Sequence, residues 1–218
     1  MCRPASGRNR NLKDRIPTSC RISTDVRRET DLRLTTARIR PLDDSELDAD
    51  QAQALAPHRP NAVLNIFRTL ANAPKAMTRF KEWGVYVLSR RNDLSFRQRE
   101  IVVLRTGFLC RSGYEWTQHV RVGKQCGLTD EEIERIKLPS SPAWDPPDAA
   151  LVKATNELHD DHFITDSTWS ELRACFTEKQ CMDVVFTAGH YTQVCMILNT
   201  FGVQLDEGQS LDPDLKGY

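Results

Sequence analysis

Two ionisable side chains, Glu115 and His119, lie four residues apart in the segment GYEWTQHV at 113–120. This i, i+4 spacing puts both side chains on one face of a helix. If the pair were exposed, it would stabilise the helix by only about 0.2–0.5 kcal/mol. The neighbouring Trp116 and Val120 are apolar, so we expect the pair to be buried or to line a cavity. Because burying an unpaired carboxylate is costly, the two groups should be paired with each other or used in function.

Metal binding, nucleophilic catalysis and proton transfer are the chemistries that such a pair could serve. A metal site would need further ligands, for which the candidates are Glu100, His159, His162 and His190, but the sequence has neither HExxH nor a repeated ExxH. A nucleophilic role for Ser112 lacks the GxSxG context of an activated serine. Proton transfer is therefore the favoured chemistry, and no metal site is expected.

Capping and periodicity predict the helices that carry these residues. Ser95 and Gln98 form a capping-box pattern that begins a largely buried helix over 94–110. The next helix covers 114–127, with Gly127 as its C-cap. Further helices are predicted within 39–55 and 61–74, from 74 to 87, and over 129–137, 149–163, 165–176 and 177–203.

The fold class is predicted to be all-α, because no segment of the body alternates convincingly between apolar and polar residues with a period of two. Residues 138–148 contain four prolines and are expected to form a loop or lid. The segment 1–38 is predicted to be a basic, disordered leader, 39–205 the helical domain and 206–218 a polar tail.

The overall composition is that of an ordinary globular protein. Thirty Lys and Arg residues balance thirty Asp and Glu residues, so net charge gives no reason to expect nucleic-acid or membrane binding. The sequence has neither an apolar run long enough to span a bilayer nor the apolar core of a secretory signal. A cytoplasmic location is expected, with a mitochondrial transit peptide as a lesser alternative for the Arg-rich start.

The seven cysteines form neither a CxxC nor a zinc-type spacing. An odd number of cysteines without a secretory signal indicates reduced thiols. Five of them lie among apolar residues and are expected to be small buried side chains: Cys110, Cys126, Cys175, Cys181 and Cys195.

The region LSFRQREIVVLRTGFLCRSGYEWTQHVRVGKQCGLTDEEIERI resembles the core of the carboxymuconolactone decarboxylase family, which also contains the alkylhydroperoxidase D proteins. The shared pattern is an R-E-x-x-x-L-R helix, a small-residue break, an aromatic residue, a site residue, a His four positions later and a G-L-T-D-E-E-I ending. The resemblance extends over roughly residues 39–205. It implies an all-helical, alkylhydroperoxidase D-like fold that assembles as a homo-oligomer, as a trimer or hexamer.

The resemblance also indicates which branch of the family this chain is similar to. The two positions of the peroxidase branch's CxxC fall on Ser112 and Glu115, while its upstream Glu falls on Glu100 and its His on His119. Thiol peroxidase chemistry needs an attacking thiolate and a resolving thiol, so the resemblance disfavours that activity here. What remains resembles the decarboxylase-like branch, which uses no metal or organic cofactor.

The expected function is therefore decarboxylation of a small anionic, unsaturated lactone acid similar to carboxymuconolactone. His119 would carry the proton, Glu115 would orient it and Glu100 would complete a relay. Arg105 could bind the substrate's anion, although an ion pair with Glu100 or with a neighbouring subunit is an equal alternative. Further candidates for substrate binding are His190, Ser112 and Tyr191.

Two alternatives stay open at the level of sequence. The same residues could catalyse isomerisation or dehydration of a related small molecule. The chain could also be a catalytically inactive helical oligomer, in which Glu115 and His119 form a buried ion pair. An enzyme requires Glu100, Glu115 and His119 to converge on a cavity with an opening, whereas an inactive oligomer does not.

Overall fold

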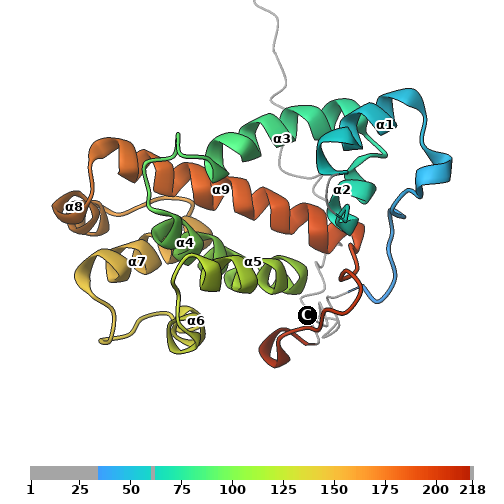
Figure 1. The fold of residues 1–218 in the computed structure, drawn as a ribbon. Coiled ribbons are helices and arrows are strands. Elements are labelled where there is room, and N and C mark those ends of the chain that lie inside the picture. The colour runs from blue at the N-terminus through green and yellow to red at the C-terminus, as the bar shows by residue number, and fades with distance from the viewer. Residues whose placement is uncertain (1–33, 60–61, 217–218) are drawn as a thin grey trace, which may run out of the picture.

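A computed structural model describes residues 34–59 and 62–216, and within these residues the chain forms helices and no strand (Figure 1). The predicted all-α fold class is thus confirmed. The α-helices are α1 (Ala49–Leu55), α2 (Asn65–Leu70), α3 (Pro74–Leu88), α4 (Phe96–Leu109), α5 (Gly113–Gln125), α6 (Asp130–Ile136), α7 (Pro146–Asp160), α8 (Asp166–Cys175) and α9 (Glu178–Phe201). Three short 3-10 helices cover η1 (Asp44–Glu46), η2 (Ala56–His58) and η3 (Pro213–Leu215).

Side-chain caps set the start of most of these helices. The predicted capping box of α4 is present, since Ser95 accepts a hydrogen bond from the backbone of Gln98 and the Gln98 side chain bonds back to the Ser95 backbone. Thr129 and Thr177 cap α6 and α9 in the same way. Such a cap is worth about 1 kcal/mol because it satisfies backbone N–H groups that the first turn leaves unpaired.

The helix α4 lies at the centre of the domain, in contact with α5, α7 and α9. The long α9 crosses the molecule beneath α3, and α4, α5 and α7 lie on its other side (Figure 1). The largest core cluster lies around α4, α7 and α9 and includes Leu104, Leu151 and Val184. A second cluster joins α2, α3 and α5 to the C-terminal half of α9 through residues such as Tyr114 and Tyr191. These two cores fix α4 and α5 relative to one another.

The segment 206–216, predicted as a polar tail, is packed against the helical domain. Asp206 accepts hydrogen bonds at 2.8 Å from the hydroxyl of Tyr114, from Nε2 of Gln118 and from the backbone N–H of Asn65. Leu215 is buried against the main core. Periodicity could not identify this packing, because the segment is held by polar contacts to distant helices and by one apolar residue rather than by a helical apolar face.

The two ends of the predicted domain and its proline-rich loop also make defined contacts. Arg38, which falls in the predicted leader, donates its backbone N–H to the carbonyl of Phe201 at 2.8 Å. In the predicted loop, Trp144 is buried and Arg135 lies over its ring. None of 138–145 lines the cavity of the candidate site described below, so the loop is not a lid over that cavity. The part of the predicted leader before residue 34 lies outside the described residues.

None of the helices in the described part of the chain combines the length and the apolar character that crossing a membrane requires.

Candidate acid–base site

Glu100, Glu115 and His119 meet where α4 packs on α5. His119 Nδ1 lies 2.7 Å from Oε2 of Glu100, and His119 Nε2 lies 3.1 Å from Oε1 of Glu115. The imidazole is therefore held between two carboxylates, one from each helix. The Glu100 and Glu115 side chains are buried, and that of His119 is 13% exposed. The structure thus brings together the three residues that the sequence predicts to be catalytic.

Small residues allow the two helices to approach closely enough for this contact. Gly107 of α4 lies against the Glu115 side chain, and Gly123 of α5 faces Leu104 and Leu128. A Cβ atom on Gly123 would lie only 3.0 Å from Cδ1 of Leu128 and 3.2 Å from Cδ1 of Leu104. A larger residue at this position would push α5 away from α4, and the carboxylate–imidazole contacts would lengthen with it.

The electrostatics of the cluster favour a protonated imidazole. Burial would lower the pKa of His119, but the charges of Glu115 and Glu100 and their hydrogen bonds outweigh burial and raise it to about 10. An imidazolium donates a hydrogen bond to each carboxylate. One imidazolium between two carboxylates gives this cluster a net charge of −1.

A cavity of about 430 Å³ lies against the exposed side of this cluster. Glu115 and His119 line it, whereas Glu100 lies behind them. Its other walls come from α2, α3 and α9 and are mostly apolar: Leu64, Ile66, Phe67, Leu70, Met77, Phe80, Gly84, Val85, Leu88 and Val194. The remaining lining residues are His58, Lys81, Ser89, Tyr114, Gln118, His190 and Tyr191.

His190 and Tyr191, two predicted substrate-binding residues, lie in the wall that α9 contributes. The Tyr191 ring is nearly perpendicular to both imidazoles, and its centroid lies 5.0 Å from that of His119 and 5.4 Å from that of His190. Burial raises the pKa of the Tyr191 phenol well above its ordinary value and lowers that of His190 to about 4. At neutral pH the cavity therefore holds a neutral imidazole and a neutral phenol near the charged cluster.

Arg105 and Ser112 do not line this cavity. The Arg105 guanidinium donates to the carbonyls of Ile136 and Lys137 at 2.9 Å and to Oδ1 of Asn156 at 2.6 Å. It therefore ties α4 to the end of α6 and to α7, and the ion pair with Glu100 that we considered from sequence is not formed. Ser112 is fully buried at the start of α5.

His159 and His162 lie apart from the acid–base cluster, in a separate cavity of about 450 Å³ that Cys110 also lines. The Nδ1 atom of His159 lies 3.8 Å from Sγ of Cys110. These two histidines therefore cannot contribute ligands to a metal site at Glu115 and His119. Among residues 34–59 and 62–216, no group of three or more His, Cys, Asp or Glu side chains is arranged to hold a metal ion.

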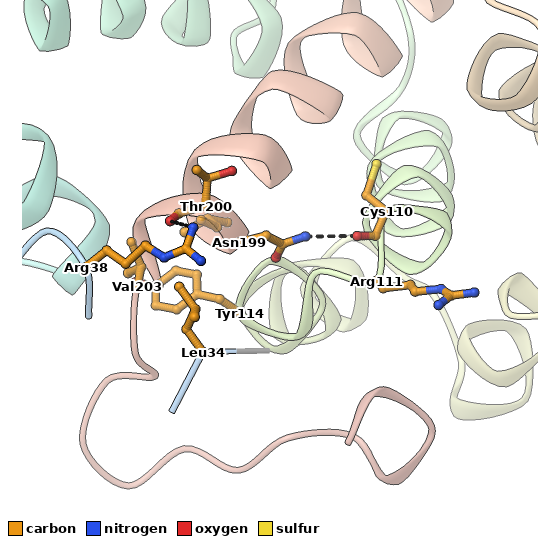
Figure 2. Close-up of a pocket in the computed structure, with 10 residues that line it drawn as sticks. Leu34, Arg38, Cys110, Arg111, Tyr114, Asn199, Thr200 and Val203 are labelled. Carbon is orange, nitrogen blue, oxygen red and sulfur yellow. Dashed lines mark hydrogen bonds between the residues drawn. The ribbon is translucent and has the colours of Figure 1, made fainter. Parts of the chain in front are cut away.

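A further cavity of about 340 Å³ lies at the C-terminal end of α9 (Figure 2). Asn199 crosses it and donates to the carbonyl of Cys110 at 2.9 Å, while Arg38 reaches the carbonyl of Thr200. Tyr114 borders both this cavity and the one at His119. Since neither Glu115 nor His119 lines this cavity, we assign acid–base chemistry to the apolar cavity of about 430 Å³ that both residues line.

The sequence did not single out the α3 wall or Gln118. The Phe80 ring lies 4.8 Å from the ring of His190, tilted by 33°, and Gly84 leaves room for that ring, since a Cβ there would lie 3.3 Å from its Nε2. Both residues belong to the helix predicted from 74 to 87. The i+4 spacing of Phe80 and Gly84 gave a signal for one shared face, but nothing in it indicated a histidine from α9 as the partner.

Comparison with known proteins agrees with this architecture. Residues 73–157 match the model of the carboxymuconolactone decarboxylase family. No curated protein matches the chain. Among solved structures, a peroxidase-related protein with an alkylhydroperoxidase AhpD core from Ralstonia eutropha JMP134 is similar with a TM-score of 0.70 and 18% identity, over 78% of this chain and 93% of that one.

Two other solved structures share the fold. A peroxidase-related protein from Silicibacter sp. TM1040 has a TM-score of 0.66 and 14% identity, over 80% of this chain and 95% of that one. The debrominase Bmp8, in a complex with 2,3,4-tribromopyrrole, has a TM-score of 0.64 and 9% identity, over 79% of this chain and 94% of that one. At these identities the likeness concerns the fold alone.

The family match spans α3 to α7 and includes all three members of the carboxylate–imidazole cluster. Residues 73–157 thus match the carboxymuconolactone decarboxylase family, within a chain that has the AhpD-like fold.

Proposed function

We propose that this protein is an enzyme that transfers a proton to or from a small unsaturated substrate bound in the cavity beside Glu115 and His119. The observation that carries the proposal is the cluster itself, in which an imidazolium is held between two buried carboxylates at the wall of an apolar cavity. Buried ionisable groups of opposite charge at the edge of a cavity are typical of acid–base sites.

Glu115 and His119 would share the proton that is exchanged with the substrate. Both ring nitrogens of His119 contact carboxylates, and the contact to Glu115 is the longer of the two at 3.1 Å. The proton on Nε2 is thus the one that a substrate can most readily reach, and Glu115 is the carboxylate that lines the cavity. Glu100, behind the ring, would hold the imidazole in orientation and retain its positive charge.

Decarboxylation of a carboxymuconolactone-like lactone acid is the reaction that the family resemblance favours. Loss of CO₂ leaves an electron pair that spreads into the unsaturated system, and His119 would then protonate carbon. Isomerisation or dehydration of a related compound is the second candidate. It is supported by the net negative charge of the cluster, which suits a group that removes a proton.

A catalytically inactive oligomer is the third candidate, in which the cluster would serve only to join α4 to α5. The cavity argues against this purpose, because a purely structural ion pair needs no opening. Two buried carboxylates around one imidazolium are also a costly way to join two helices, since apolar residues of similar volume often stabilise a protein as well or better.

The test is CO₂ release from carboxymuconolactone, measured together with incorporation of solvent deuterium into the recovered substrate and product. Wild-type protein is compared with His119→Asn and Glu115→Gln, and with Glu131→Gln as a matched change at an exposed site on α6. Loss of an acid–base group should reduce the rate by about 10²- to 10⁴-fold.

The outcomes separate the three candidates. Release of CO₂ that depends on Glu115 and His119 supports a decarboxylase. Deuterium incorporation without CO₂ release, lost in the same two variants, supports an isomerase-type proton transfer. If folded His119→Asn and Glu115→Gln retain all the activity of the Glu131→Gln control, the cluster is not the site and the proposal fails.

A further inference from the structure

Three residues that line the cavity have a buried polar atom without a partner among the described residues. These atoms are Nε2 of His58, Nδ1 of His190 and Oε1 of Gln118, and the exposed fractions of His190 and Gln118 are 6% and 7%. The Gln118 oxygen is an acceptor, so it would need a donor and does not bear on how a carbonyl oxygen is bound. Buried polar groups in proteins nearly always have a partner, so the N–H of the His190 imidazole, which has none among the described residues, is available to an acceptor on a ligand.

No guanidinium lines this cavity. Two buried guanidiniums lie in the same domain, but Arg99 donates to the carbonyls of Val87 and Ser89 at 2.9 and 3.0 Å, and Arg105 to those of Ile136 and Lys137. The cations that line the cavity are the His119 imidazolium, already held between two carboxylates, and Lys81, which is partly exposed.

The rest of the lining suits an apolar ligand. Side chains of Ile66, Phe67, Leu70, Met77 and Phe80 form a continuous apolar wall opposite the cluster. A ligand carboxylate that bound here would lose its hydration to this apolar wall. It would also lie close to a cluster with a net charge of −1. Both the loss of hydration and the repulsion between like charges would weaken its binding.

We infer that the cavity binds an uncharged, largely apolar carbonyl compound, such as an unsaturated lactone or enone, whose carbonyl oxygen is bound by His190 and whose acidic C–H faces Glu115. This inference rests on the proposed function and selects proton abstraction from carbon over decarboxylation. It differs from the anionic substrate that the sequence predicts, because no unoccupied guanidinium lines the cavity.

The proton-transfer step balances without a further reactant. The C–H bond at the saturated carbon next to the conjugated C=C–C=O system breaks, and the proton goes to the Glu115 carboxylate, whose negative charge it neutralises. The electron pair moves into the conjugated system and onto the carbonyl oxygen, where the N–H of the neutral His190 imidazole donates a hydrogen bond. Return of the proton to the same or another carbon of that system regenerates Glu115 and gives the starting compound or its isomer.

The position of Tyr191 supports this division of roles. Its ring centroid lies 5.0 Å from that of His119 and 5.4 Å from that of His190, so one small ring compound bound beside Tyr191 lies near both imidazoles. A Cβ atom on Gly84 would lie 3.3 Å from Nε2 of His190, so the glycine leaves room beside that nitrogen.

Binding of a matched set of probes tests the inference by isothermal titration calorimetry. The first probe is a five-membered α,β-unsaturated lactone with a pentyl chain on its γ-carbon. The second carries a carboxylate in place of the terminal methyl group of that chain, and the third is the cyclic ether of the same shape without the carbonyl. We expect the neutral lactone to bind at least tenfold more tightly than the carboxylate, a difference of about 1.4 kcal/mol.

Variants of His190 then assign the carbonyl contact. His190→Leu should weaken binding of the neutral lactone by about tenfold and leave the affinity of the ether unchanged, since only the lactone loses a hydrogen bond. His190→Gln, which keeps a donor, should recover part of the lost affinity. Thermal unfolding of each variant checks that the fold is intact, and His190→Gln serves as the test if His190→Leu does not fold.

The inference is overturned if the carboxylate binds as tightly as the neutral lactone, if neither lactone binds, or if folded His190 variants lose affinity for the lactone and the ether equally. The proposed function is tested separately, by exchange of the γ-hydrogen of the neutral lactone in D₂O. Binding of the neutral lactone without any exchange would support the inferred ligand class and contradict the proposed function.

Discussion

Replacing Glu115 by Gln should lower the pKa of His119 from about 10 to about 7. The substitution keeps the size of the side chain and its ability to hydrogen bond, but it removes one negative charge that lies 3.1 Å from Nε2. Two unit charges about 4 Å apart at a partly buried site interact with about 4 kcal/mol. At 1.36 kcal/mol for each pKa unit, this corresponds to a fall of about 3 units.

The pKa of about 7 expected for His119 in Glu115→Gln also has a physical explanation. Glu100 stays in contact with Nδ1 at 2.7 Å and continues to favour the imidazolium, while burial disfavours it. The remaining attraction and the cost of burial should then roughly offset one another, which leaves the pKa close to the ordinary value of histidine. The reciprocal variant, Glu100→Gln, should lower the pKa by a comparable amount, because each carboxylate contacts one ring nitrogen.

Titration by NMR measures the shift directly. Protein labelled with ¹⁵N at histidine contains five imidazoles, and the His119 signals are assigned by their loss in His119→Asn. The chemical shifts of both ring nitrogens are followed from about pH 6 to pH 11 in wild-type protein, in Glu115→Gln and in Glu131→Gln, the exposed control. A pKa that stays above about 9 in Glu115→Gln would show that this carboxylate does not support the imidazolium, and the reasoning about the cluster would be wrong.

Three further perturbations follow from the contacts of the fold. Because the pKa of His119 is raised on folding, its contribution to the free energy of unfolding is complete below the unfolded value of about 6.5 and is lost as pH rises towards 10. Urea unfolding of wild-type protein should therefore show a steeper loss of stability from pH 7 to pH 10 than that of His119→Gln, and parallel curves would contradict this. Gly202→Ala should lower the free energy of unfolding by about 1–3 kcal/mol, because Gly202 has a φ of 68° and the new Cβ would lie 2.9 Å from the carbonyl oxygen of Thr36. Gly189→Ala, in the interior of α9 with open space around it, is the matched control and should be neutral or stabilising by up to about 1 kcal/mol. Asp206→Ala should cost about 2–3 kcal/mol, since it leaves the buried Tyr114 hydroxyl and one N–H of the Gln118 amide without their acceptor; a loss below about 0.5 kcal/mol would show that these contacts do not hold the C-terminal segment.

Local patterns in the sequence were sufficient to predict that Glu115 and His119 share one face of a helix. Capping residues such as Ser95 and Thr129 accept hydrogen bonds from backbone N–H groups only three residues away. They therefore mark the starts of helices without knowledge of the fold. The i, i+4 spacing likewise fixes Glu115 and His119 on one helical face. Glu100 was predicted by resemblance, and its contact with His119 depends on the approach of α4 to α5.

The interpretation of Arg105 shows where local patterns mislead. With 3.6 residues per turn, a residue five positions after Glu100 lies about 140° around the helix, which is too far for the two side chains to meet. The guanidinium instead reaches carbonyls at the end of α6. Contacts of this kind join segments more than 30 residues apart, and no periodicity within a single helix reports them.

The boundaries of the family match divide the cavity into two parts of different origin. Residues 73–157 supply Glu100, Glu115 and His119, so the groups that we propose to exchange the proton all come from the matched segment. Ile66 and Phe67 precede that segment, while His190 and Tyr191 follow it. Substitutions in the flanking helices can therefore change the shape and polarity of the cavity without altering the carboxylate–imidazole cluster. Under the proposed function, α2 and α9 are the segments in which to alter substrate preference, whereas a fragment limited to 73–157 would keep the carboxylate–imidazole cluster and lose the part of the cavity wall that these two helices contribute.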